Sequence, residues 1–299
     1  MNDVGELPLV FVALDGSPAS ATALPVAQVV ADQLGATVAI LHIPTPEISL
    51  AALRQRLRRT IAATAPLRLE TTPDPAEGIL RVLDDPRVIL IVLTTHGRAI
   101  RPRRGLGHVA EAVIARTTRP ILLVRPEAVQ QRPVTGFHRL LVPLDGTPTT
   151  ALVLQPAVQL AQLLQASIDL LIVASPDQPL PTEPGSIAAP RYIDQPQHEW
   201  PAWATEVIER LGCLCAGLAP GVPVRLWLRV GDVATMILTF ATEHDIDAIV
   251  LARRSHLEPG RARVLRAVLA ETPCPVFLTG DAATLAHARD IAKVDATLS

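Results

Sequence analysis

What this sequence lacks excludes several classes of protein. No apolar run approaches the roughly 20 residues that a membrane-spanning helix needs. The 27 basic and 29 acidic side chains leave a net charge of −2, which argues against a surface made for nucleic acid. Residues 1–10 contain neither the basic stretch nor the long apolar stretch of a signal peptide. We therefore expect a cytoplasmic protein with no membrane partner and no nucleic-acid partner.

Cysteine is scarce, with three in 299 residues, which suits a reducing compartment better than a disulfide framework. Cys213 and Cys215 stand too close together for half of a zinc site, and the eight histidines show no metal-ligand pairing. We interpret the cysteines as packing residues and expect no metal site. The chain also has no P-loop, no G-x-S-x-G elbow and no H-x-G-H near its first helix. We therefore expect no catalytic residues and no enzyme.

What the sequence does contain is an internal repeat. Residues 11–43 resemble residues 140–173, and at one fixed offset Asp15-Gly16-Ser17 matches Asp145-Gly146-Thr147. The two halves also end alike, at 108–124 and 263–279. A repeat of this length is a duplicated domain, since each copy can bury a core of its own. We predict these parts: domain 1 (1–126), a linker (127–137), domain 2 (138–280) with a proline-rich insertion (175–201), and a C-terminal helix or tail (281–299).

Strands and helices alternate in both copies, which predicts right-handed crossovers and a parallel sheet. Apolar runs rich in Val and Leu are typical of strands that are covered on both faces. Ser17 and Pro18 have the chemistry of a helix start, and Gly35 that of a helix end. Copy one has predicted strands at 7–14, 36–43, 67–71, 88–94 and 120–124, with helices at 18–34, 49–63, 75–83 and 107–117. Copy two has predicted strands at 138–144, 167–173, 223–229, 247–252 and 275–279.

Polar residues at two strand ends are candidates for ligand binding. Asp15 follows the first strand, and residues 94–97 follow the fourth. The crevice of an open parallel sheet lies beyond such carboxyl ends, where the strand order reverses. A carboxylate there can accept from a ribose hydroxyl or an amine, and a glycine turn lets N–H groups approach a phosphate. The helix that begins at Gly107 would point its positive end into the same crevice.

These segments resemble the universal stress protein (UspA-like) family in its tandem-domain form. The resemblance covers residues 7–279 and is carried by V-A-L-D-G-S (12–17), V-P-L-D-G-T (142–147), T-T-H-G-R (94–98), G-H-V-A-E-A-V (107–113) and the closing strands. It implies an α/β fold with two doubly wound, five-stranded parallel sheets in the order 3-2-1-4-5, of the adenine-nucleotide alpha-hydrolase-like type. It also implies that the first and fourth strands are neighbours, with Asp15 beside the 94–108 loop.

ATP-binding members of this family carry G-x₂-G-x₉-G-[ST] after the fourth strand. Its four positions fall here on Thr94, Gly97, Gly107 and His108, so the spacing is intact while two residue types differ. The resemblance thus implies a site for ATP or a related adenine nucleotide in copy one. Its candidate residues are Ala13, Asp15, Ser17, Thr94, His96, Gly97, Gly107, His108 and Val109. Around the phosphates, positive charge would come from Arg98, Arg101, Arg103 and Arg104.

Copy two departs further from the motif. It has Ala252-Arg253-Arg254-Ser255 at the corresponding strand end and Ala262 at the last glycine position. We expect it not to bind ATP in this way, although its arginines could hold another anion. Two functions stay open: a nucleotide-responsive stress protein, or a nucleotide-free interaction or scaffold module, each with protein partners that the sequence does not name.

Members of the family commonly dimerise by antiparallel pairing of their fifth strands. Here the two fifth strands, 121–124 and 276–278, belong to one chain. The resemblance therefore implies a pseudo-dimer within the chain, in which the pairing satisfies the N–H and C=O groups of both edges. Whether two such chains form a further homodimer stays open.

Overall fold

The computed structural model describes residues 7–42, 67–69, 74–97, 106–145, 147–174, 205, 209, 221–252 and 259–279. The strands of copy one are β1 (Leu9–Leu14), β2 (Thr37–His42), β3 (Leu67–Leu69), β4 (Val88–Thr94) and β5 (Ile121–Val124). Its helices are α1 (Pro18–Ala21), α2 (Ala23–Leu34), α4 (Pro75–Val82) and α5 (His108–Arg116), and α6 (Pro126–Gln131) follows β5. Most of α6 falls in the segment predicted as the linker.

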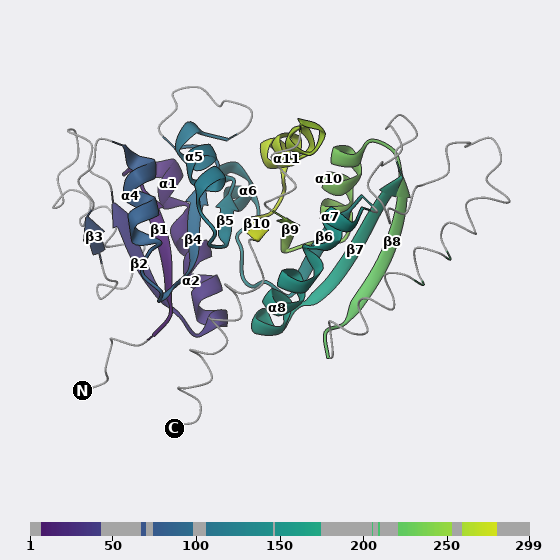
Figure 1. Ribbon diagram of the computed structural model, residues 1–299, viewed down its shortest axis with the longest axis horizontal. Coiled ribbons are helices and arrows are strands. Elements are labelled where there is room, and N and C mark those ends of the chain that lie inside the picture. The colour runs from purple at the N-terminus through teal and green to yellow at the C-terminus, as the bar shows by residue number, and fades with distance from the viewer. Residues whose placement is uncertain are drawn as a thin grey trace.

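Copy two repeats this arrangement. Its strands are β6 (Arg139–Leu144), β7 (Ser167–Ala174), β8 (Val224–Val230), β9 (Ala248–Ala252) and β10 (Val276–Thr279). Its helices are α7 (Pro148–Ala151), α8 (Leu154–Leu164), α10 (Val233–Glu243) and α11 (Pro259–Glu271). Ten strands of the described residues form a single sheet in the order β3-β2-β1-β4-β5-β10-β9-β6-β7-β8 (Figure 1). Each half has the predicted order 3-2-1-4-5.

The two copies join through antiparallel pairing of β5 with β10, in which Leu122 lies opposite Phe277. This confirms the predicted pseudo-dimer within one chain. Two buried apolar clusters, one on each face of the sheet, both extend across the two copies. Helices α2 and α8 cover one face, and α4, α5, α10 and α11 cover the other (Figure 1). In the first cluster the ring of Phe137 packs edge-on against the ring of Phe277, with 5.5 Å between the ring centroids. The two copies therefore share a core.

The helix predicted over residues 18–34 is two helices in the structure. α1 and α2 lie on either side of Thr22, which is in a turn. Pro25 explains the break, since it has no N–H to donate to the Ala21 carbonyl in a continuous helix. As the third residue of α2 it needs no intrahelical acceptor. The same break recurs in copy two, where Pro156 is the third residue of α8.

Three predicted elements lie outside the described residues: the helix at 49–63, the proline-rich insertion at 175–201 and the C-terminal helix within 281–299. The domain bounds stay predictions. Within the described part of the chain, no helix is long and apolar enough to cross a membrane.

Candidate functional site

Asp15 and Gly97 meet beyond the carboxyl ends of two adjacent strands. β1 and β4 pair in parallel, so the turn after β1 lies beside the loop after β4. The Asp15 Oδ1 atom accepts a hydrogen bond of 2.9 Å from the Ser17 N–H, which fixes the carboxylate at the turn. A Cβ added at Gly97 would overlap the Asp15 carboxylate and come within 3.1 Å of its Cγ. Any side chain at position 97 would therefore displace the Asp15 carboxylate.

Thr95 holds the loop after β4 to its surroundings. Its side chain is buried, its N–H donates to the Val124 carbonyl at 2.9 Å, and its carbonyl accepts from the Gly107 N–H at 2.7 Å. The first bond ties the loop to the end of β5, and the second ties it to the start of α5. The segment at 94–97 and the start of α5 are therefore held together across a long stretch of sequence.

His96 bonds to the helix that follows β5. Its Nε2 lies 2.9 Å from Oε1 of Glu127, and its Nδ1 lies 3.1 Å from the Thr95 hydroxyl. Burial favours the protonated form of Glu127, but a bond from its own backbone, the bond to His96 and the charge of Arg125 hold the pKa of this carboxyl below its usual value. An ionised carboxylate only accepts hydrogen bonds, so His96 donates to Glu127 through a protonated Nε2.

The N-terminus of α5 lies at the same edge of the sheet. Gly107 is its N-cap, in an extended conformation, and as a glycine it has no side chain to cap the helix. By contrast, Asp74 caps α4 and Asp232 caps α10 with a carboxylate oxygen. The first turn of α5, which includes Glu111, thus presents N–H groups and the positive end of a helix dipole without a carboxylate on its N-cap residue.

The remaining predicted residues surround this core of the site. Ser17 caps α1 and accepts from the Ser20 N–H. Ala13 and Val109 are half-buried against the apolar cluster below the crevice, while Thr94 is half-buried at the end of β4 and His108 is exposed. Asp15, His96, Gly97 and Gly107 are therefore brought together by direct contacts or shared partners, and His108 is not. The arginines at 98, 101, 103 and 104 lie outside the described residues.

The corresponding turn of copy two uses its carboxylate within the turn. Asp145 Oδ1 accepts from the Thr147 N–H at 3.0 Å, from the Thr147 hydroxyl at 2.6 Å and from the Thr150 hydroxyl at 2.6 Å. Asp145 therefore stabilises the start of α7, whose N-cap is Thr147. The register of β9 with β10 pairs Ala252 with Thr279, as β4 with β5 pairs Thr94 with Val124. The two strand ends are thus equivalent positions.

Sequence reasoning missed three residues at this edge of the sheet. Thr95 stands within the quoted motif but was given no role, and Glu127 was assigned to the linker. His42 ends β2 fully buried, with its Nδ1 2.9 Å from the Leu14 carbonyl, and its Nε2 has no hydrogen-bond partner among the described residues. A histidine that ends an apolar strand was the available signal for this position.

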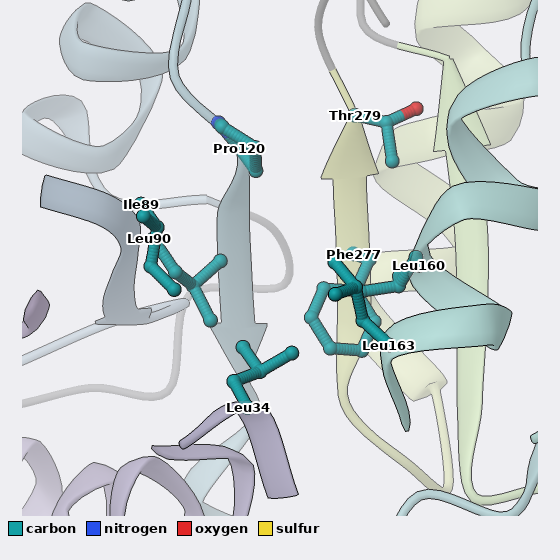
Figure 2. Close-up of a pocket in the computed structure, with 8 residues that line it drawn as sticks. All are labelled: Leu34, Ile89, Leu90, Pro120, Leu160, Leu163, Phe277 and Thr279. Atoms are coloured by element: carbon teal, nitrogen blue, oxygen red, sulfur yellow. The ribbon is translucent and has the colours of Figure 1, made fainter. Parts of the chain in front are cut away.

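A small apolar pocket lies elsewhere, at the junction of the two copies. Figure 2 shows Leu34, Ile89 and Phe277 among the side chains that line it. Ile89 is near the amino end of β4, whereas the candidate site follows its carboxyl end. The pocket therefore does not belong to the candidate site, and its lining, apolar apart from Thr279, lacks the donors that a phosphate needs.

Metal chemistry finds no support in the described part of the chain, where no three His, Cys, Asp or Glu side chains cluster. Cys274 is buried there, and burial raises the pKa of its thiol to about 12. That thiol remains protonated and packs in the core, as expected from the sequence. Cys213 and Cys215 lie outside the described residues.

Comparisons with known proteins agree with this architecture. No curated protein matches the chain. A Pseudomonas aeruginosa structure described as a universal stress protein is 16% identical with a TM-score of 0.61, over 96% of this chain and 98% of its own. A universal stress protein from Archaeoglobus fulgidus is 15% identical with a TM-score of 0.59, over 91% of this chain and 98% of its own. At these identities the likeness establishes the fold.

A family protein from Arabidopsis thaliana solved with AMP bound is 16% identical, over 48% of this chain and 92% of its own, with a TM-score of 0.32. That likeness is too slight to carry an argument about ligands. The family model, in contrast, matches two segments, residues 68–125 and 136–279, which together make up more than half of the chain. This chain therefore belongs to the universal stress protein family.

Proposed function

We propose that copy one binds ATP or a related adenine nucleotide beyond the carboxyl ends of β1 and β4, and that the protein acts as a nucleotide-responsive stress protein. The observation that carries the proposal is the N-terminus of α5, which has a glycine as its N-cap residue and lies at the same edge of the sheet as the Asp15 carboxylate. The helix N-terminus favours a phosphate, and the carboxylate favours a hydroxyl or an amine. A nucleotide carries a phosphate, ribose hydroxyls and the adenine amine on one molecule.

The phosphates would bind to the first turn of α5. The N–H groups of His108 and Val109 lie there, and the exposed His108 imidazole can add a further donor. Gly107 has a different role from the one expected of a motif glycine, since its own N–H is bonded to Thr95. Gly107 therefore closes the loop, and the residues after it contact the anion.

Asp15 would bind the nucleoside. A carboxylate accepts a hydrogen bond from a ribose hydroxyl or from the adenine amine, and the Ser17 N–H holds it in place for that purpose. Ala13 and Val109 supply the half-buried apolar surface next to it. Copy two is not expected to bind in this way, because Asp145 is bonded to the two threonines of its own turn.

The test is a pair of matched variants, Asp15→Ala and Asp145→Ala. ATP affinity is measured by isothermal titration calorimetry, beside mass spectrometry of any nucleotide released from the purified wild-type protein. We expect Asp15→Ala to weaken binding by about tenfold or more, because it removes a charged hydrogen-bond acceptor. Asp145→Ala is expected to keep the wild-type affinity. A wild-type protein that neither releases nor binds nucleotide would instead favour the nucleotide-free interaction module.

A further inference from the structure

The segment at 94–97 is supported by a side chain from outside its own domain. Glu127 belongs to α6, in the stretch between the two copies, and its carboxylate accepts from His96 Nε2 at 2.9 Å. The other ring nitrogen of His96, Nδ1, lies 3.1 Å from the hydroxyl of the buried Thr95. Two residues further along the loop from Thr95, Gly97 touches Asp15. An unbroken chain of contacts therefore runs from α6 to the strand-end carboxylate.

Copy two anchors the stretch of chain that carries Glu127. The Arg125 guanidinium lies 3.6 Å from Glu127 Oε2 and donates to the Thr272 carbonyl at 3.1 Å, just past the end of α11. At the other end of α6, Arg132 donates to the Ile246 carbonyl, also at 3.1 Å. Both arginine contacts reach backbone carbonyls of copy two. Contacts with copy two therefore hold α6, and with it Glu127, at both ends of the helix.

We propose that Glu127 is a positioning residue for the candidate nucleotide site: its carboxylate holds His96 and thereby sets the conformation in which Gly97 meets Asp15. The consequence for ligand affinity rests on the proposed function, but the positioning itself does not. The lowered pKa of Glu127 agrees with a carboxylate that stays ionised and keeps accepting from His96. The protein thus uses the segment between its copies to order the site of copy one.

Copy two has no equivalent of this arrangement in its sequence. Counting from the paired strand ends, Arg254 stands where copy one has His96, and Ala282 stands where it has Glu127. A cation and an alanine cannot form the same bond. The proposed positioning interaction therefore belongs to copy one, the copy that keeps the motif glycines Gly97 and Gly107.

The first experiment compares Glu127→Ala with Glu77→Ala. Glu77 is a matched control because its carboxylate also accepts from one nitrogen-bearing side chain, Arg116 at 2.6 Å, and both glutamates are 40% exposed. Hydrogen–deuterium exchange is measured without nucleotide at residues 95–97. We expect exchange there to rise about three- to tenfold in Glu127→Ala, as the loss of a half-exposed charged hydrogen bond implies, and to be unchanged in Glu77→Ala. Equal exchange in the two variants would overturn the proposal.

A conservative variant and a spectroscopic signature separate positioning from a general loss of structure. Glu127→Gln keeps an acceptor oxygen without the charge, so its exchange should fall between those of wild type and Glu127→Ala. In the wild-type protein, the ¹⁵N shifts of the His96 ring should report a protonated Nε2. An Nε2 that carries no proton would contradict the hydrogen bond to Glu127, whatever the variants do.

The ATP titration distinguishes this proposal from the proposed function. If the wild-type protein binds no ATP, the proposed function fails, while exchange and ring shifts still decide whether Glu127 positions the loop. If wild type binds, we expect Glu127→Ala to bind about three- to tenfold more weakly than Glu77→Ala. Equal affinities would refute the role of Glu127 in the site.

Discussion

The two copies place an aspartate at the same turn but surround its carboxylate with different side chains. In both copies Oδ1 accepts from the N–H two residues along the chain, at 2.9 Å for Asp15 and 3.0 Å for Asp145. In copy two, Asp145 also accepts from the hydroxyls of Thr147 and Thr150, both in the turn that follows it. In copy one, the carboxylate of Asp15 also lies against Gly97, from the loop after another strand. A duplicated fold can therefore keep its motif residue while changing what that residue does.

The hydroxyls of the following helices account for this difference. The Ser20 hydroxyl donates to the Ser17 carbonyl at 3.0 Å, whereas the corresponding Thr150 hydroxyl makes its shorter bond, 2.6 Å, to the Asp145 carboxylate. Copy two thus closes a polar network within one turn. In copy one, the Asp15 carboxylate instead lies against Gly97, in the loop after β4.

The largest expected effect concerns a buried ion pair that only copy two has. Arg139 Nε lies 2.5 Å from Asp169 Oδ2, and Trp227 Nε1 donates to the other oxygen at 2.6 Å. At the same offset, copy one has Leu9 and Ala39. Since Asp169 is 1% exposed, Asp169→Ala leaves a largely buried guanidinium without its partner. We expect a loss of about 3 kcal/mol in the free energy of unfolding, measured by urea denaturation.

A double variant tests whether the ion pair itself contributes to the stability of copy two. Arg139→Leu combined with Asp169→Ala removes both charges and restores the residue types that copy one has at these positions. Replacing a buried ion pair by apolar side chains is often close to neutral. The double variant should therefore recover most of the stability that Asp169→Ala loses. A double variant as unstable as the single one would show that the pair itself stabilises copy two.

The next effect concerns Gly97, which copy two replaces with Ser255. Gly97→Ala would push its methyl group into the Asp15 carboxylate, so we expect a loss of about 1–2 kcal/mol in the free energy of unfolding. Gly107→Ala is the matched control, because a Cβ there would lie at an ordinary 3.5 Å from the Thr95 carbonyl oxygen. Its loss, measured in the same urea titration, should be smaller. The reverse order would contradict the close approach of Gly97 to Asp15.

Much of the fold could be predicted because its signals are local or repeated. Apolar runs such as 88–94 are strands in the structure, and Ser17 caps a helix as its side chain implies. The resemblance to the family supplied the pairing of β5 with β10. The break in the first helix was missed, although Pro25 is the residue that causes it.

The candidate site also has one part that could be predicted from the sequence and one part that could not. Asp15 and Gly97 could be expected to meet, since both follow the ends of strands that are neighbours in this fold. The bond between His96 and Glu127 could not, because it joins residues 31 positions apart that share no motif. Such a contact depends on the direction of α6 after β5, which copy two helps to fix. Only the assembled molecule contains that information.

The smallest expected effect concerns the residue that ends the second helix of each copy. Gly35 and Gln165 both adopt left-handed backbone, with φ of 62° and 54°. A Cβ at Gly35 would meet nothing within 4 Å, so a substitution there reports backbone conformation alone. Gly35→Gln should lose about 1 kcal/mol in the free energy of unfolding, because a side chain disfavours this region.

The reciprocal change, Gln165→Gly, should raise the free energy of unfolding by less than about 1 kcal/mol, since the greater freedom of glycine in the unfolded chain offsets part of the relief. Both changes are measured by urea denaturation of the whole chain. Opposite signs at the two positions would establish that the copies differ here in side chain and not in backbone. A loss at both positions would instead mean that the Gln165 side chain stabilises copy two through contacts of its own.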